Sequence, residues 1–152
     1  MTMKIQTALI AGSIVLLCVA GGAYVVLSQR DSRESVASVA SEEESFVFER
    51  ADTEVARVQG LSGRKEVPSN YGLLFVFPTA DMYGFWMKDM YVSIDIAWLS
   101  EEGVVLAIDE NVSPDTFPQA FYPPRPVRYV LETRAGEMKR QGWGVGDRVP
   151  LP

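Results

Sequence analysis

Tyr91-Val92-Ser93-Ile94-Asp95-Ile96-Ala97-Trp98-Leu99 is the stretch that decides the fold. It is apolar and rich in β-branched and aromatic residues, and so is Val104-Val105-Leu106-Ala107-Ile108, which follows it. Short apolar runs of this kind are typical of buried strands. Glu101-Glu102-Gly103 lies between the two runs and has the composition of a tight turn. Together these residues predict a β-hairpin.

Short elements flank this hairpin on both sides. Strands are expected at 46–48, 73–77, 127–131 and 145–149, helices at 52–59 and 135–141, and a proline-rich loop at 112–127. Pro78 is expected to stop the strand before it, since proline cannot donate to a sheet. Asp52 or Thr53 would cap the first helix, which Gly60 would end. The sequence therefore predicts an α+β, mainly β domain: a compact antiparallel sheet or small barrel with short helices.

The N-terminal part of the chain has a different character. Residues 5–29 carry no charge and are mostly apolar, and about 20 such residues can cross a bilayer as a helix. We expect residues 1–30 to be a single transmembrane anchor. A signal peptide cleaved near Ala20-Gly21-Gly22-Ala23 is the alternative. Residues 31–45 are rich in Ser, Ala and Glu, and they are expected to form a flexible acidic tether.

The charges beside the apolar segment specify its orientation only weakly. Lys4 precedes the segment, and Arg30 and Arg33 follow it. A short tail before the segment and a folded domain after it favour a signal anchor. The domain at residues 46–152 is then expected outside the cytoplasm, bound to the membrane through residues 5–29. Cleavage of a signal peptide would instead secrete it.

The composition argues against several classes of function. The formal net charge is −6 and no basic cluster is present, so nucleic acid is not an expected partner. The 152 residues include no His, and Cys18 is the only Cys. The commonest general base, a disulfide and a Cys-based zinc site are thereby removed. Met82, Met87 and Met90 surround Trp86, but without His or Cys they indicate core packing rather than a copper site. We expect no metal and no cofactor.

Charged residues within the strand-like sequence form a candidate site. Side chains alternate between the two faces of a strand. If the strands that carry them are neighbours, four of these residues converge beside Trp86, and Arg64 reaches in from the turn after the first helix. The candidate ligand-binding residues are Arg64, Trp86, Lys88, Asp95, Arg128 and Glu132. As a site, the cations would hold an anionic or hydroxyl-bearing molecule on which Trp86 stacks. As structure, the same residues would pair and fix the strand register.

Several phrases of the chain together match a known pattern. They are Gly60-Leu61-Ser62-Gly63-Arg64, Gly72-Leu73-Leu74-Phe75-Val76-Phe77, Phe85-Trp86-Met87-Lys88, Ile94-Asp95, Val130-Leu131-Glu132 with Gly136, and Gly142 through Asp147. In their order and spacing, residues 46–152 resemble the bacterial and archaeal domain of unknown function 192. The resemblance implies a small strand-rich domain, often behind a signal or anchor, and it implies no activity. The chain departs from the pattern at Ser62, Asp89-Met90 and Ser93-Ile94, where the family usually has Met, Asn-Thr and Pro-Leu.

Three functions are compatible with these observations. The first is a membrane-anchored extracytoplasmic domain that binds a small polar or anionic ligand at the candidate residues. The second is a cell-envelope hydrolase that uses Asp95 or Glu132, and its mark would be a carboxylate of raised pKa in a water-accessible cleft. If the two acted together as acid and base, their carboxyl groups would need a defined separation. The third is an interaction module that meets a protein partner through Phe117, Phe121 and Tyr122 of the proline-rich loop, provided that these form one exposed apolar patch.

Overall fold

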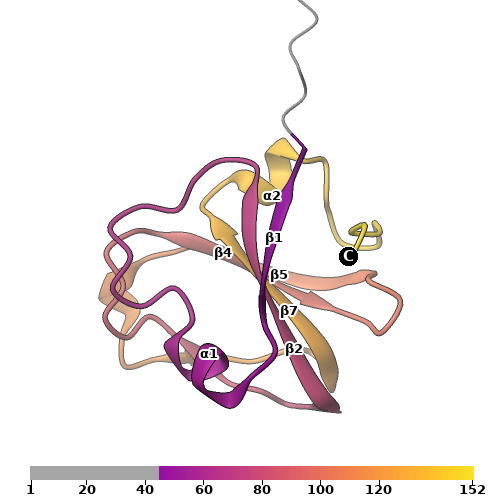
Figure 1. Cartoon of the computed structure of the whole chain (residues 1–152), viewed down its shortest axis with the longest axis horizontal. Helices are drawn as coiled ribbons and strands as arrows, with labels where there is room; N and C mark the ends of the chain where they lie inside the picture. The colour runs from indigo at the N-terminus through magenta and orange to yellow at the C-terminus, as the bar shows by residue number, and fades with distance from the viewer. Residues whose placement is uncertain (1–44) are drawn as a thin grey trace, which may run out of the picture. The chain divides into compact units, whose positions relative to one another are not determined.

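The computed structural model describes residues 45–152, which form a five-stranded sheet, a two-stranded ribbon and two short helices (Figure 1). The elements are β1 (Val47–Ala51), α1 (Glu54–Gln59), β2 (Tyr71–Asp81), β3 (Phe85–Trp86), β4 (Ile94–Leu99), β5 (Val105–Val112), a 3-10 turn (Pro114–Thr116), β6 (Ala120–Phe121), β7 (Val127–Arg134) and α2 (Glu137–Arg140). The expected anchor at 5–29 and the tether up to residue 44 lie outside the described residues. Within residues 45–152, no helix has the length and apolar character needed to cross a membrane.

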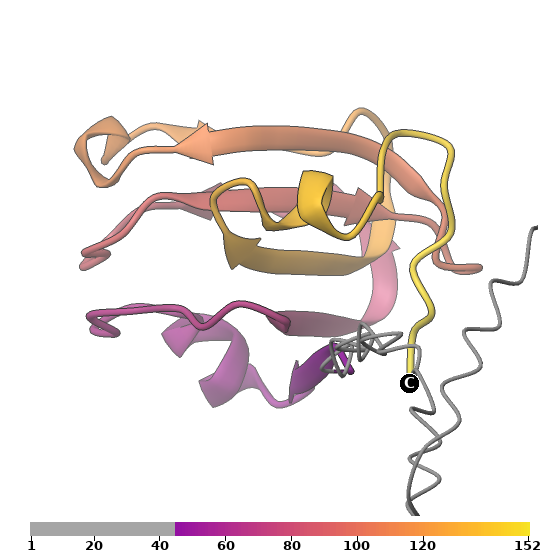
Figure 2. The same ribbon diagram turned by 90° about the horizontal axis from the view of Figure 1, so that it is seen from above.

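The large sheet has the strand order β1-β2-β7-β4-β5, and Figure 2 shows the strands following one another in this order. The α+β, mainly β class is confirmed. The sheet is open rather than closed into a barrel, and it is mixed rather than purely antiparallel, because β1 pairs with β2 in parallel. A parallel pair needs a long crossover connection. Helix α1 and the loop that follows it provide that connection.

The sequence signals for the hairpin turn and for the two ends of the first helix are confirmed. The hairpin of β4 and β5 turns at residues 101–103, where Gly103 has a positive φ of 79°. The hydroxyl oxygen of Ser100 accepts hydrogen bonds from the backbone of Glu102 and of Val104, both at 3.2 Å. In α1, the Thr53 side chain accepts from Ala56 N at 3.2 Å, and Gly60 ends the helix with φ 52°. Both elements depend on residues close together in sequence.

Two of the expected strands differ most from the structure. Strand β2 runs past Pro78 to Asp81. Proline is tolerated there because the register of β2 with β7 shifts between Val76 and Asp81, so Pro78 lies where the regular ladder is interrupted. The expected strand at 145–149 is reduced to a single bridge between Val104 and Arg148.

The sheet buries apolar side chains on both of its faces. We call one the pocket face; its buried side chains include Leu73, Phe75, Ile96, Trp98 and Val130. We call the other the α2 face; its buried side chains include Leu74, Ala97, Leu99, Leu131 and Met138. Successive residues of one strand alternate between the two clusters, as the pleat of a sheet requires. The face on which a strand residue lies therefore decides which neighbours it can meet.

Candidate functional site

A pocket with a volume of about 310 Å³ opens between α1 and the pocket face. This volume lies at the lower end of the range of about 300–1,000 Å³ that is usual for small-molecule sites. Five aromatic side chains line the pocket: Phe75, Phe77, Tyr83, Phe85 and Trp86. Helix α1 and the loop after it add polar groups to the lining: Glu54, Arg57, Gln59 and Ser62. Apolar walls with a few polar groups are typical of sites that bind small molecules.

The aromatic walls are held by contacts among the rings. Phe85 packs edge-on against Phe75 and Trp98, with centroid distances of 4.8 and 5.4 Å. Tyr83 stacks on Phe77 at 3.5 Å, and its hydroxyl donates to the Thr79 carbonyl at 2.8 Å. Edge-to-face and stacked pairs of this kind each contribute about 0.5–1.5 kcal/mol beyond area burial. The walls are therefore formed before any ligand enters.

Glu132 is the one acidic side chain of the central strand β7 that lies within this pocket. Its register partners are Leu73 on β2 and Ile96 on β4, which places it among apolar neighbours. The carboxyl is buried, and no residue between 45 and 152 hydrogen-bonds its Oε2 atom. Burial raises the pKa of Glu132 to about 8, although the charge of Arg64 partly opposes the rise. The group is therefore mostly neutral at pH 7, with one proton to donate.

Gly60 lies directly beside this carboxyl. A Cβ atom at Gly60 would lie 3.8 Å from Glu132 Oε2 and 3.4 Å from the Phe75 ring. The positive φ of Gly60 also favours glycine at this position. The C-terminal end of α1 therefore passes close to the buried acid.

The cations named from the sequence do not meet in the pocket. Arg64 donates to both carboxyl oxygens of Glu49, at 2.7 and 3.1 Å, and to the Tyr71 hydroxyl at 2.7 Å. Hydrogen bonds from Arg64 and Tyr71 hold the pKa of Glu49 below its ordinary value. Arg128 donates to the Phe77 carbonyl at 2.9 Å. These two arginines fix a loop and a strand end rather than a ligand.

The segment from residue 85 to 88 alternates as expected. Phe85 and Met87 are buried, while Trp86 is 58% exposed and Lys88 is exposed. Trp86 lines the pocket, but Lys88 does not. The Lys88 carbonyl accepts a hydrogen bond from the Ser62 hydroxyl at 2.9 Å. Trp86 and Glu132 are thus the two predicted residues that the structure brings together in one pocket.

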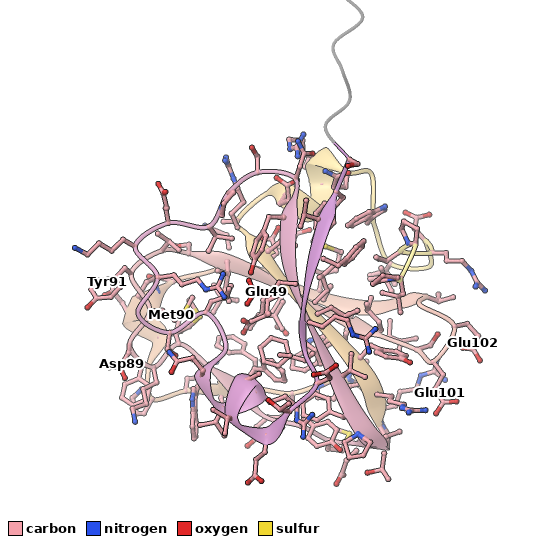
Figure 3. The ribbon with its side chains drawn as sticks, in the orientation of Figure 1. Glu49, Asp89, Met90, Tyr91, Glu101 and Glu102 are labelled. Carbon is pink, nitrogen blue, oxygen red and sulfur yellow. The ribbon has the colours of Figure 1, made fainter. Side chains whose placement is uncertain are left out.

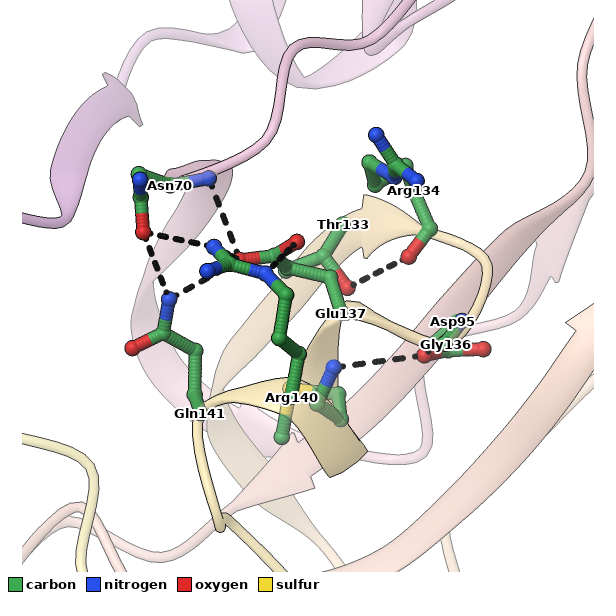
Figure 4. Close-up of polar contacts among 9 residues, drawn as sticks. Asn70, Asp95, Thr133, Arg134, Gly136, Glu137, Arg140 and Gln141 are labelled. Carbon is green, nitrogen blue, oxygen red and sulfur yellow. Dashed lines mark hydrogen bonds and ion pairs between the residues drawn. The ribbon is translucent and has the colours of Figure 1, made fainter. Parts of the chain in front are cut away.

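Asp95 lies on the α2 face, and its expected convergence with Glu132 and Trp86 is wrong. Asp95 pairs with Thr133, whereas Glu132 pairs with Ile96, so the two carboxyl groups project from opposite faces of the sheet. One Asp95 oxygen accepts from Asn111 N at 2.9 Å. The other accepts from Gly136 N at 2.8 Å, drawn in Figure 4, and from Met138 N at 3.4 Å. Asp95 therefore anchors the start of α2.

A third buried carboxyl, Glu137, was not singled out from the sequence. Figure 4 shows it within a network that includes Asn70, Arg140 and Gln141. Burial alone would raise the pKa of Glu137, but the hydrogen bonds from Arg140 and Gln141 outweigh it and lower that pKa. This network ties α2 to the start of β2. From the sequence alone, only the i,i+3 spacing of Glu137 and Arg140 could have indicated this network.

The remaining acidic groups do not assemble a metal site. Within residues 45–152, no three side chains of the metal-binding types come together. Glu101 and Glu102 lie at the β4–β5 turn, far from the pocket. Figure 3 shows them on the opposite side of the molecule from Met90, which lines the pocket. These two carboxylates are exposed.

The proline-rich loop divides its aromatic residues between the surface and the core. Phe117 and Tyr122 are exposed, whereas Phe121 is partly buried and packs against the pocket-face cluster. Phe121 also pairs with Phe85 across the β3–β6 ribbon. The three rings therefore do not form one exposed patch of the kind that would favour a protein-binding loop.

The solved structures that are similar to this chain include the following two. One comes from Sinorhizobium meliloti 1021 and is provisionally described as a transcription regulator. It is 35% identical, with a TM-score of 0.63, over 66% of this chain and 78% of its own. The other is a protein of unknown function from Novosphingobium aromaticivorans DSM 12444. It is 29% identical, with a TM-score of 0.65, over 70% of this chain and 75% of its own.

The comparison with curated proteins returns no match. The family comparison does, because residues 36–151 match the family DUF192, which is described as an uncharacterized ACR. The match includes the whole sheet, Trp86 and Glu132. This chain therefore belongs to the domain of unknown function 192 family.

Proposed function

We propose that the domain binds a small neutral ligand, a saccharide ring, in the pocket that ends at Glu132. The observation that supports this most is the unpartnered Oε2 atom of Glu132. A buried polar atom without a hydrogen bond costs about 1–3 kcal/mol. A ligand oxygen that accepts the Glu132 proton recovers this energy. A hydroxyl or acetamido carbonyl group of a sugar offers such an oxygen.

The charges around the pocket favour a neutral ligand. Arg57 lines the pocket, but it donates to the Val76 carbonyl at 2.9 Å and lies over the Phe77 ring at 5.4 Å. Arg64 is occupied by Glu49 and Tyr71. A cationic ligand would be repelled by Arg57, and an anionic ligand would be repelled by Glu54, which lines the same pocket. We therefore narrow the expected polar or anionic ligand to a neutral one.

The pocket walls favour a ring with an apolar face. Trp86 lines the pocket and is 58% exposed, so its ring is available for stacking. Glu54 and Gln59 on the rim can exchange hydrogen bonds with hydroxyl groups. Aromatic side chains beside carboxyl and amide groups suit a saccharide, which has apolar C–H faces and a rim of hydroxyl groups.

Two other functions, hydrolysis and DNA binding, have less support. A hydrolase that pairs Asp95 with Glu132 lacks its geometry, because the two groups lie on opposite faces of the sheet. The description of the Sinorhizobium relative suggests contact with DNA, but a net charge of −6 disfavours binding to phosphates.

Thermal unfolding of the full-length protein with glucose or N-acetylglucosamine tests the proposal. A ligand at 100 times its Kd stabilises the folded state by about 2.7 kcal/mol. We expect one of these sugars to raise the Tm of the wild type and of Lys88→Ala, whose exposed side chain lies outside the pocket. Glu132→Leu should abolish the shift because it removes the proton donor. Trp86→Ala should weaken binding roughly 3- to 10-fold, which corresponds to about 0.5–1.5 kcal/mol of lost stacking.

The proposal fails if both sugars, at millimolar concentration, leave the wild-type Tm unchanged. It also fails if Glu132→Leu and Trp86→Ala fold normally and keep the full shift. In that case the sugar binds elsewhere on the molecule.

We also propose that residues 5–29 anchor the chain and that the domain lies outside the cytoplasm. The uncharged apolar run supports this. We expect the full-length chain to stay with membranes after alkaline carbonate extraction and to be digested by protease added to intact cells. A chain that lacks residues 1–30 should be found in the soluble fraction. A secreted chain that begins near residue 24 would show cleavage instead, and a full-length chain protected from the protease would reverse the orientation.

A further inference from the structure

The β3–β6 ribbon carries two exposed aromatic rings beside the pocket. Its register pairs Phe85 with Phe121 and Trp86 with Ala120. Phe85 is buried, so its side of the ribbon faces the core, and Trp86 lies on the other side. The next pair in this register is Gly84 with Tyr122. The outer side of the ribbon therefore carries both Trp86 and Tyr122, which are 58% and 59% exposed.

The ring of Tyr122 lies directly on Gly84. A Cβ atom at Gly84 would come within 2.8 Å of Tyr122 Cε1 and 3.1 Å of Cζ. Any larger residue at Gly84 would displace the ring. Gly84 also lines the pocket, as Trp86 does. The Tyr122 ring is thus placed at the lip of the pocket by the backbone beneath it.

Trp86 and Tyr122 stand at diagonal positions of an antiparallel pair. Such positions are about 7–8 Å apart, which leaves room for successive rings of one ligand. The Tyr122 hydroxyl makes no hydrogen bond to any residue between 45 and 152. Tyrosine and tryptophan lose little conformational entropy on binding, because each has only two χ angles. We call these two side chains the aromatic platform.

We infer that the pocket and the aromatic platform together bind an oligosaccharide rather than a single sugar. One ring enters the pocket beside Glu132 and stacks on Trp86, and the ring that follows stacks on Tyr122. This inference rests on the proposed function and gives it a ligand class. A protein partner fits less well, since stable protein interfaces bury about 1,200–2,000 Å² and two rings on a short ribbon offer far less.

Calorimetric titration of the full-length protein with the monomer, dimer and tetramer of N-acetylglucosamine, and with the corresponding glucose series, tests this inference. We expect the Kd of the wild type to fall roughly tenfold from monomer to tetramer, as aromatic pairs of about 0.5–1.5 kcal/mol imply. Tyr122→Ala should bind the monomer as the wild type does and lose the gain with length. Tyr122→Phe keeps the ring and should keep the gain. Glu132→Leu should weaken binding at every length.

The outcomes separate the two proposals. If the wild type binds monomer and tetramer with the same Kd, the oligosaccharide inference is overturned and the proposed pocket stands. An unchanged length dependence in a folded Tyr122→Ala protein overturns the inference too. If the wild type binds no member of either series, the proposed function fails and the inference fails with it.

Discussion

The wild type is expected to lose stability as the pH rises from about 5 to about 8, and the Glu132→Gln variant is expected to keep its stability over this range. The folded-state pKa of Glu132 is about 8, against 4.5 for an ordinary Glu. Unfolding therefore releases a proton between these pH values, and a rising pH favours that release. The contribution of Glu132 to the free energy of unfolding is complete below pH 4.5 and is lost as the pH rises through about 8. Glutamine has no such proton to release.

The size of the effect follows from the pKa difference. Each pH unit in this window changes the free energy of unfolding by about 1.4 kcal/mol. Between pH 5 and pH 8 the wild type should therefore lose about 4 kcal/mol. The lowered pKa values of Glu49 and Glu137 place their contributions at lower pH, where they are lost as the pH falls. These groups do not mask the slope of Glu132.

Urea unfolding of residues 45–152 at four pH values between 5 and 8 measures this difference. The curve for Glu132→Gln should be nearly flat and should lie several kcal/mol above the wild type at pH 8. Glu54→Gln is the matched control, because Glu54 lines the same pocket but is exposed. Its slope should equal that of the wild type. Parallel curves for the wild type and Glu132→Gln would show that Glu132 is not a neutral buried acid.

Asp95→Ala is expected to lower the free energy of unfolding by about 3–5 kcal/mol, since it leaves three backbone N–H groups without their acceptor. Asp95→Asn should also be destabilising. Both Asp95 oxygens accept from N–H groups, so an amide NH₂ group would face a donor on one side. Asp115→Ala, at an exposed position, is the control and should change stability by less than about 0.5 kcal/mol.

The Asp95→Ala variant also distinguishes a structural role of Asp95 from a role in ligand binding. Asp95 lies on the α2 face, so a folded Asp95→Ala protein should bind sugars with the wild-type Kd. Calorimetry at a temperature where the variant is folded measures this. Wild-type stability in Asp95→Ala would contradict the anchoring role, and a lost sugar response in the folded variant would place Asp95 in the site after all.

Several features of the fold could be predicted from the sequence because they depend on neighbouring residues. The turn at Gly103, the cap at Thr53 and the helix end at Gly60 each use side-chain or backbone chemistry within a few residues. The alternation of buried Phe85 and exposed Trp86 follows from the pleat of a single strand. The family resemblance, carried by short phrases in order, is confirmed by the match over residues 36–151.

The register between distant strands could not be predicted. A shift of one residue moves a side chain to the other face of a sheet. The register places Asp95 and Glu132 on opposite faces. Asp95 lay within an expected strand, whereas Glu132 lay just beyond the expected end of the strand at 127–131, which in fact continues to Arg134. The pocket walls were missed for a related reason. Phe75 and Phe77 have the pattern of core residues, and nothing in the sequence showed that they line a pocket together with Gly60 and Gly84.

A carbon-13 NMR titration of the Glu132 carboxyl group, with and without N-acetylglucosamine, tests the central claim most directly. The free protein should show a pKa near 8 for this group. The bound sugar should raise that pKa further, because a ligand that accepts the proton favours the neutral acid. A pKa near the ordinary value of 4.5 for Glu132, unchanged by the sugar, would contradict both the buried acid and its role in binding.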